Sequence, residues 1–115
     1  MAESELNVLR GSLDLLILKA LSWGPKHGYA VAEWIEHATE AALLVEEGTL
    51  YPALHRLDRR GWVRTEWGIS ENNRKAKFYQ LTAAGRAQLR EEAPVWHRYA
   101  DAIAKALRTT EPGVA

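Results

Sequence analysis

The chain contains no cysteine, so it can form neither a disulfide bond nor a thiolate metal site. No apolar run approaches the ~20 residues that a membrane-spanning helix needs. The first residues, "MAESELNVLRG", carry acids and lack the basic-then-apolar order of a signal peptide. A chain of 115 residues is long enough for one modest core. Together these features predict a soluble, cytoplasmic protein.

Motifs of catalysis are also missing. The sequence holds no GxSxG, no HExxH and no phosphate-binding loop that ends in Gly-Lys-Ser/Thr. The four histidines are scattered, and His37 with Glu40 makes a single i, i+3 pair, which is a poor basis for a metal site. We therefore predict a protein that is not an enzyme and that needs no cofactor.

Neither sign of charge dominates the chain, but the charges are unevenly placed. Residues 1–47 hold three Lys or Arg against eight Asp or Glu, whereas residues 48–78 hold seven against three. Residues 79–115 are nearly balanced, with five against four. Positive charge is thus concentrated in the middle of the chain, which favours contact of that stretch with a polyanion.

Hydrophobic spacing predicts two helices in the first 39 residues. The first spans residues 12–23, with Ser12 as its N-cap and Asp14 in its first turn, and a Gly-Pro pair follows it. The second spans residues 28–39 and is expected to turn Tyr29 inward. The short apolar stretch that follows is too brief to assign.

Residues 48–60, "GTLYPALHRLDRR", repeat apolar positions at i, i+3, i+4 and i+7, which predicts an amphipathic helix ended by Gly61. The apolar face consists of Leu50, Ala53, Leu54 and Leu57. The remaining arc carries Thr49, Tyr51, Pro52, His55, Arg56, Arg59 and Arg60. A helix that only filled a core would have little use for this polar arc, so we interpret it as a DNA-facing surface. Arg59 and Arg60 also complement the helix dipole at this end, so their role stays open.

Beyond Gly61 the hydrophobic period changes to about two, which predicts strands at residues 62–67 and 75–81. The tip between them is basic, with Arg74, Lys75 and Lys77 placed to meet phosphates or the minor groove. Three helices and a hairpin in this order predict a mainly α fold with a small β-hairpin, the winged helix-turn-helix. Four tryptophans are assigned to core or strand packing: Trp23, Trp34, Trp62 and Trp67.

Thr82 is a suitable N-cap for a last helical segment at residues 82–108, in which Pro94 predicts a kink or a break. A narrow apolar seam runs along it: Leu89, Ala93, Trp96, Ala100, Ile103 and Leu107. Such a seam favours pairing between subunits, although packing on the first helix of the same chain is the alternative. Residues 109–115 are expected to form a disordered tail.

Three stretches together, "HGYAVAEWI", "GTLYPALHRLDRRGWV" and "NNRKAKFYQLTAAGRAQL", resemble the PadR family of bacterial transcriptional regulators. The similarity runs in continuous order from about Leu9 to Leu89. The short C-terminal region resembles the small subfamily, which has one C-terminal helical segment. The resemblance implies a homodimer, usually a repressor, that binds a palindromic operator.

Carried onto this sequence, the resemblance implies that residues 1–81 form the DNA-binding domain and residues 82–108 join the subunits. Helix 48–60 would read DNA through Thr49, Tyr51, His55 and Arg56, and the wing would add Arg74, Lys75 and Lys77. Of these, Arg56 is expected to reach guanine O6 and N7 with two parallel hydrogen bonds. Since some relatives hold flat aromatic compounds between interface tryptophans, Trp96 and Tyr99 become candidates for a small aromatic effector site. The rival interpretation is a winged helix that binds other proteins through its acidic half and does not recognise specific DNA.

Overall fold

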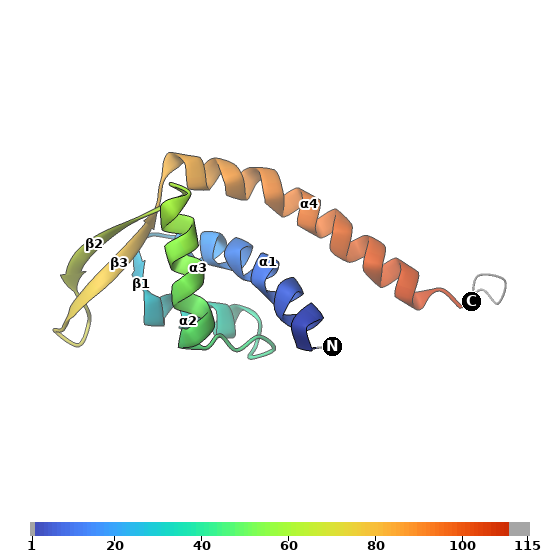
Figure 1. Cartoon of the computed structure of the whole chain (residues 1–115), viewed down its shortest axis with the longest axis horizontal. Helices are drawn as coiled ribbons and strands as arrows, with labels where there is room; N and C mark the ends of the chain where they lie inside the picture. The colour runs from blue at the N-terminus through green and yellow to red at the C-terminus, as the bar shows by residue number, and fades with distance from the viewer. Residues whose placement is uncertain (1, 111–115) are drawn as a thin grey trace.

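A computed structural model describes residues 2–110, with side-chain surroundings from Gly11 onward. Its elements are α1 (Ala2–Leu21), β1 (Lys26–His27), α2 (Gly28–Ala38), α3 (Glu47–Arg59), β2 (Val63–Ile69), β3 (Lys75–Leu81) and α4 (Ala83–Arg108). The first three helices and the base of the sheet form a compact body (Figure 1). The β2–β3 hairpin projects from one end of this body, and α4 extends past α1 beyond the other end. The predicted mainly α fold with a winged hairpin is confirmed.

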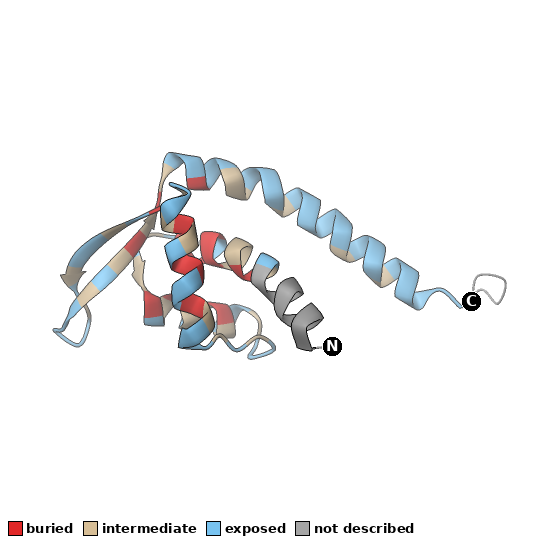
Figure 2. Cartoon of the chain, viewed as in Figure 1, coloured by how far each residue is buried: buried red, intermediate tan, exposed pale blue. Residues whose placement is uncertain are grey.

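The core lies where α1, α2 and α3 meet the base of the sheet. Its fully buried side chains include Leu13, Ile17 and Leu21 from α1, together with apolar residues of the other elements. Those from the rest of the body are Val31, Ile35, Leu50, Ala53, Leu54, Leu57 and Val63. Burial ends abruptly outside the body, since most of α4 and the outer wing are exposed (Figure 2). Aliphatic packing in the body therefore supplies most of the hydrophobic stabilisation.

The first helix begins earlier than its sequence signals predicted. Because α1 starts at Ala2, the roles of Ser12 as N-cap and of Asp14 as a first-turn acid are wrong. Asp14 lies in the middle of the helix, where its carboxylate pairs with a residue of α3. The helix still ends close to the expected place, three residues before Gly24.

The second helix matches its predicted bounds within a residue, but one residue predicted on its buried face is exposed. Tyr29 was expected inside and is exposed, while Ile35 is buried as its spacing predicts and Val31 packs in the core beside it. The imidazole Nδ1 of His27 accepts a hydrogen bond from the backbone N–H of Ala30 at 3.2 Å, so this histidine caps the helix.

The sheet has three antiparallel strands in the order β1-β3-β2. The two-residue strand β1 pairs with β3 and was not predicted, because two residues are too few to show a period. The hairpin register runs from Val63 opposite Leu81 to Ile69 opposite Lys75. The strand β3 has its predicted bounds, whereas β2 ends two residues later than predicted, so the loop is shorter and the paired ribbon extends nearly to the tip of the wing.

Thr82 joins the end of α3 to the start of α4. The helix α3 closes with Gly61 in a left-handed conformation (φ 76°), and the N–H of Trp62 donates to the carbonyl of Leu57 at 3.0 Å. The Thr82 hydroxyl donates to the Gly61 carbonyl at 2.6 Å and accepts from the Gly85 N–H at 3.0 Å. The predicted N-cap is therefore confirmed, and the same hydroxyl ties two helices together.

The last helix is one continuous element of 26 residues. It runs through Pro94 without interruption, so a break into two helical pieces is wrong (Figure 1). Leu89 packs against the core, whereas the rest of the helix beyond it is largely exposed. Residues 111–115 of the expected tail lie outside the described residues. None of the helices over residues 2–110 is long and apolar enough to cross a membrane.

Candidate nucleic-acid interface

The helix α3 presents one face to the core and the opposite face to solvent. The four residues of its predicted apolar face are all buried. The opposite arc is exposed and includes Pro52, His55 and Arg59, which are spaced at i, i+3 and i+7 and so lie in one line along the helix. Tyr51 and Arg60 are exposed beside this line, and Thr49 is half-buried on its flank. A polar surface one helix long is thus available to a partner.

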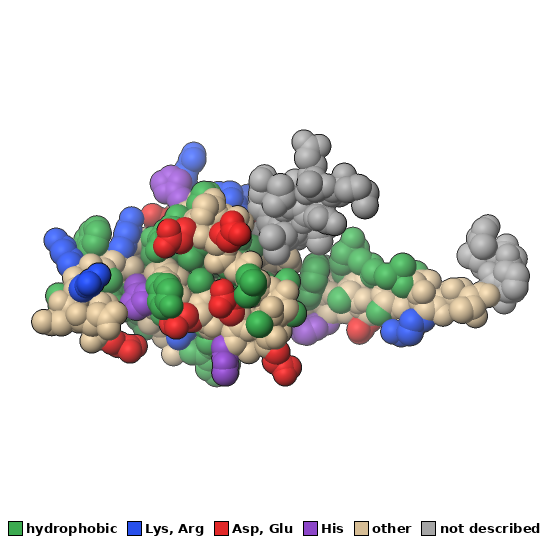
Figure 3. Space-filling view, turned by 90° about the horizontal axis from the view of Figure 1, so that it is seen from below, with side chains coloured by type: hydrophobic (Ala, Val, Ile, Leu, Met, Phe, Trp, Pro, Cys, Tyr) green, Lys and Arg blue, Asp and Glu red, His purple; other side chains and the backbone are tan. Residues whose placement is uncertain are grey.

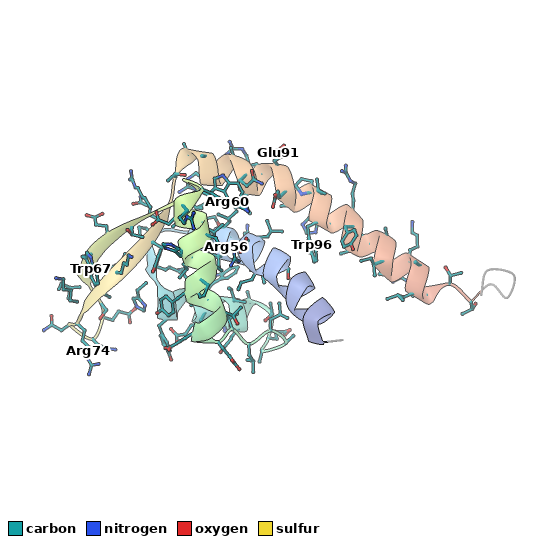
Figure 4. All side chains as sticks on the ribbon, viewed as in Figure 1. Arg56, Arg60, Trp67, Arg74, Glu91 and Trp96 are labelled. Atoms are coloured by element: carbon teal, nitrogen blue, oxygen red, sulfur yellow. The ribbon has the colours of Figure 1, made fainter. Side chains whose placement is uncertain are left out.

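Arg56 is turned away from that outer line and paired with α1. Its guanidinium donates to the Asp14 carboxylate over 2.7 Å, and the two side chains are 33% and 20% exposed. Figure 4 shows Arg56 directed from α3 toward α1. The contact joins residues 42 positions apart and links α3 to α1. For Arg56 to contact a base, this ion pair would first have to open.

Tyr51 connects α3 to both α2 and the sheet. A Cβ added at Gly28 would lie 2.6 Å from the Tyr51 hydroxyl, so any larger residue there would push the Tyr51 ring out of its place. Burial, with Tyr51 and Asp58 nearby, raises the pKa of the Tyr79 phenol above its ordinary value of 10.0. Tyr79 is therefore kept neutral where the base of the wing meets the flank of α3. This junction links the base of the wing to the flank of α3.

The wing carries the expected cations on its outer part. Arg74, Lys75 and Lys77 are all exposed, and Figure 4 places Arg74 at the tip. The tip turns through Asn73, which has φ 60°, and the N–H of Ser70 donates to the Arg74 carbonyl at 2.8 Å. Flexible cations on a rigid ribbon are suited to phosphate contacts.

The tryptophans divide into two groups that the sequence did not distinguish. Trp34 and Trp62 are partly buried against the core, as predicted. Trp23 and Trp67 are 67% and 62% exposed, so their assignment to core or strand packing is wrong. Lysine ammonium groups lie over both exposed rings, at 5.1 Å for Lys19 and 5.2 Å for Lys75.

Carboxylates gather at the opposite end of α3 from its arginines. An open hollow between α2 and α3 is lined in part by Glu33, Glu36, Glu46 and Glu47. Glu46 is the N-cap residue of α3, but its side chain makes no capping hydrogen bond. Figure 3 shows red carboxylates over the body and blue Lys and Arg side chains at the wing end of the molecule. A polyanion would be repelled from the acidic end and attracted to the other, which fixes its orientation.

The seam along α4 is exposed at Trp96, Ile103 and Leu107, whereas Ala93 and Ala100 are half-buried. Trp96 and Tyr99 form a tilted ring pair with centroids 5.9 Å apart. They line an open hollow of about 610 Å³ between α1 and α4, to which Leu15 and Val95 also contribute. Figure 4 shows Trp96 pointing from α4 toward the α1 side. In the described part of the chain, no group of three His, Asp or Glu side chains could hold a metal ion.

Helices α2 and α3, the wing that follows them and the outward polar arc define the molecule as a winged helix-turn-helix protein. Residues 17–91 match the model of the transcriptional regulator PadR-like family. The chain belongs to this family. The resemblance noted in the sequence is confirmed, and because the family consists of transcriptional regulators, so is the expectation of a non-enzymatic protein.

Three relatives illustrate the similarity. The chain is 44% identical over 84 residues to the transcriptional regulator Rv3488 of Mycobacterium tuberculosis, which covers 72% of this chain and 74% of that protein. A PadR family regulator from Eggerthella lenta is 31% identical and has a TM-score of 0.73, over 95% of this chain and 93% of the other. The Bacillus subtilis PadR in complex with operator DNA shares the fold, with a TM-score of 0.62 at 24% identity, over 70% of this chain and 45% of that one.

Proposed function

We propose that this protein is a dimeric repressor that binds a palindromic operator through α3 and the wing. The observation that carries the proposal is the outward line of Pro52, His55 and Arg59 on the helix beside a basic hairpin. Arg59 can read guanine O6 and N7 with paired hydrogen bonds, which discriminates by about 1–3 kcal/mol. Tyr51 and Thr49 are suited to phosphates, which position the helix without specifying sequence.

The wing supplies the second part of the binding surface. Its cations, Arg74, Lys75 and Lys77, contact backbone phosphates beside the groove that α3 enters. Each phosphate neutralised releases counterions, so affinity should fall steeply with salt. Arg56 serves first to hold α3 on α1 through Asp14, and any base contact of its own depends on opening that pair. A regulator that binds operator DNA in this way acts in the cytoplasm, where the genome lies.

Pairing of two chains through residues 82–108 completes the operator-binding unit, with residues 1–81 as the DNA-binding domain. In support, the α4 seam of Ala93, Trp96, Ala100, Ile103 and Leu107 is left uncovered in the single chain, except that its two alanines are half-buried. Two paired chains would set their recognition helices about 34 Å apart, one turn of the duplex. That spacing is the physical reason to expect a palindromic site.

A small aromatic compound is proposed as the effector that releases the repressor. The support is the hollow between α1 and α4, in which the Trp96 and Tyr99 rings offer flat apolar surfaces. The same α1 carries Asp14, the partner of Arg56. A ligand that shifts α1 against α4 would therefore change the position of α3, which is linked to α1 by the Asp14–Arg56 pair.

Fluorescence anisotropy with overlapping duplexes from the region upstream of the protein's own gene tests this function. Each duplex is titrated across a salt series with the wild-type chain and with Arg59→Ala. The matched control is Arg98→Ala, which removes the same charge from the exposed side of α4. We expect tight binding to one duplex, a loss of sequence preference in Arg59→Ala and wild-type behaviour in the control.

Uniformly weak binding to every duplex, equal in both variants, would contradict the operator-binding function. A random-sequence duplex selection then separates an operator located elsewhere from a winged helix that binds proteins. If the selection enriches a palindrome, the operator lies elsewhere; if it enriches nothing, the interaction module is the better interpretation.

A further inference from the structure

The outer edge of β2 has no partner in the sheet. The strand order is β1-β3-β2, so in the described part of the chain β2 bonds to β3 on one side only. Figure 1 shows β2 on the side of the projecting wing that faces away from β1. Its seven residues, "VRTEWGI", include neither proline nor lysine, the residues with which proteins commonly keep a free edge from pairing. A long strand edge is therefore available to another strand.

The backbone groups on this free edge belong to alternate residues. At the two ends of the hairpin, the N–H of Thr82 donates to the Trp62 carbonyl and the N–H of Ser70 donates to the Arg74 carbonyl. The register is unbroken between these two bonds, and hydrogen-bonded pairs alternate along an antiparallel ladder. The even-numbered residues of β2 therefore bond to β3. The odd-numbered residues direct their N–H and C=O groups outward: Val63, Thr65, Trp67 and Ile69.

The charged side chains make this edge complementary to itself. Arg64 and Glu66 are both exposed and are separated by one residue, so they lie on the same face of the strand. Two copies of β2 can align antiparallel with the Thr65 residues opposite each other. In that register Arg64 lies opposite the partner's Glu66, and Glu66 lies opposite the partner's Arg64. These are the non-hydrogen-bonded pairs of the new ladder, in which opposite side chains approach most closely.

The neighbouring registers are less favourable. A shift of one step in either direction places two Arg64 side chains or two Glu66 side chains directly opposite each other, and such like-charge pairs are destabilising. A register with the Trp67 residues opposite each other avoids this repulsion but pairs neither charge. Among the described residues, the Glu66 side chain has no ion pair or hydrogen bond, and the Arg64 guanidinium makes one long hydrogen bond, 3.4 Å, to Gln80. Both charges are therefore available to a second copy.

The same register gives the exposed indole of Trp67 an apolar neighbour. Trp67 is 62% exposed and lies on the same face of β2 as the buried Val63. When the strands align about Thr65, each Trp67 lies opposite the partner's Val63. The Lys75 ammonium, 5.2 Å from the ring centroid, already restricts the indole, and Figure 4 shows Trp67 on the projecting part of the wing. Burial of two indoles would add apolar stabilisation to the two ion pairs.

We propose that the free edge of β2 is a self-association surface, to which a second copy of this chain adds its own β2. Two three-stranded sheets then join into one continuous antiparallel sheet, with Thr65 on the twofold axis. The contact is separate from the α4 seam, so it links dimers into larger species. The paired segment, residues 63–67, is short for a stable interface, and we expect a dissociation constant on the order of 10–100 μM. The inference concerns only the contact between two chains and does not rest on operator binding.

A charge-reversal experiment tests the two ion pairs. Sedimentation velocity of the full chain is measured over concentrations on both sides of the expected constant, for the wild type, Arg64→Glu and Glu66→Arg. Each variant alone places like charges opposite each other, so its self-association should weaken about tenfold. An equimolar mixture of the two variants should restore it, because each introduced charge then faces one of opposite sign. Glu71→Arg, the same charge reversal in the exposed loop at the wing tip, is the matched control and should associate as the wild type does.

Cysteine cross-linking tests the register. The chain contains no cysteine, so each introduced thiol is unique. Thr65→Cys should form a disulfide between chains under mild oxidation, because opposite Cα atoms of a hydrogen-bonded pair are about 5.5 Å apart, within the range of a disulfide. Trp67→Cys would face the partner's Val63 and should not cross-link. Thermal unfolding of each variant checks that the fold is retained.

Two results would overturn the inference. One is a concentration dependence that is the same in the wild type and in both charge-reversal variants. The other is cross-linking of Trp67→Cys in place of Thr65→Cys, which would exclude the register that pairs Arg64 with Glu66. Neither assay contains DNA, so a failure here leaves the proposed operator binding intact, and a failure of operator binding leaves this contact intact.

Discussion

The ion pair between Asp14 and Arg56 should stabilise the protein measurably, and the two residues should not act independently. Both side chains are partly buried, so the pair lies between an exposed pair, worth about 0–1 kcal/mol, and a fully buried one. We therefore expect Asp14→Ala and Arg56→Ala each to lower the free energy of unfolding by about 1.5 kcal/mol. For a domain of this size, that lowers Tm by several degrees.

A double-mutant cycle in urea measures the coupling directly. The double variant should cost about 1 kcal/mol less than the sum of the two single variants, because the contact can be lost only once. Arg59→Ala, an exposed arginine on the same helix, is the matched control and should change stability by no more than about 0.5 kcal/mol. Costs that simply add would show that the pair does not hold α3 on α1, and would refute the reasoning.

The same variants decide what Arg56 does on DNA. If Arg56 positions the helix, Asp14→Ala and Arg56→Ala should weaken operator binding by similar factors and leave the preferred sequence unchanged. A loss confined to Arg56→Ala, with relaxed preference at one base pair, would instead assign Arg56 to base recognition.

Three further measurements test other parts of the molecule. Gly85→Ala should destabilise the protein by about 1–3 kcal/mol in thermal unfolding, because the added Cβ would lie 2.0 Å from the Trp62 carbonyl oxygen. Gly11→Ala is the control: its Cβ meets open space, and the variant should be more stable by about 0.5–1 kcal/mol. The pKa of Tyr79 is raised in the folded state, so the folded protein keeps the phenol proton to a higher pH than the unfolded protein does. The free energy of unfolding should therefore decline as pH rises above 10.0, and Tyr79→Phe should reduce that decline in alkaline urea titrations. Ile103→Asp should convert a dimer to monomers in sedimentation velocity, because the exposed seam would then carry a charge.

Each of these has a clear opposing result. Equal stability of the two glycine variants would mean that the start of α4 can move away from the strand. An alkaline decline that is the same in Tyr79→Phe would assign it to other groups. A dimer that survives Ile103→Asp would place the subunit contact outside the α4 seam.

Sequence periodicity predicted α3 well because its apolar spacing and its terminal glycine agree. The start of α1 was missed for a physical reason, since Ser12 and Asp14 mimic a helix start. In the fold, Asp14 is instead needed in the middle of the helix as the partner of Arg56. Local signals cannot reveal a contact made across 42 residues.

The exposed Trp67 was missed for a different reason. A strand pattern shows which side chains share a face, but not where along the strand the core stops. Val63 and Trp67 have the same phase, yet one is buried and the other projects beyond α3. Only the position of the hairpin relative to the body shows that the outer part of the wing extends beyond the hydrophobic core. The aromatic content of β2 was the available signal, and it was interpreted as packing.

Thr82 couples the orientation of α4 to the end of α3. Its hydroxyl binds the end of α3 and the first turn of α4 at once, and the Trp62 carbonyl accepts the Thr82 N–H at 3.1 Å. From this joint a continuous helix of 26 residues extends for about 39 Å along its axis. A tilt of α4 would therefore act directly on the end of α3, through the hydrogen bonds that Thr82 makes to both helices.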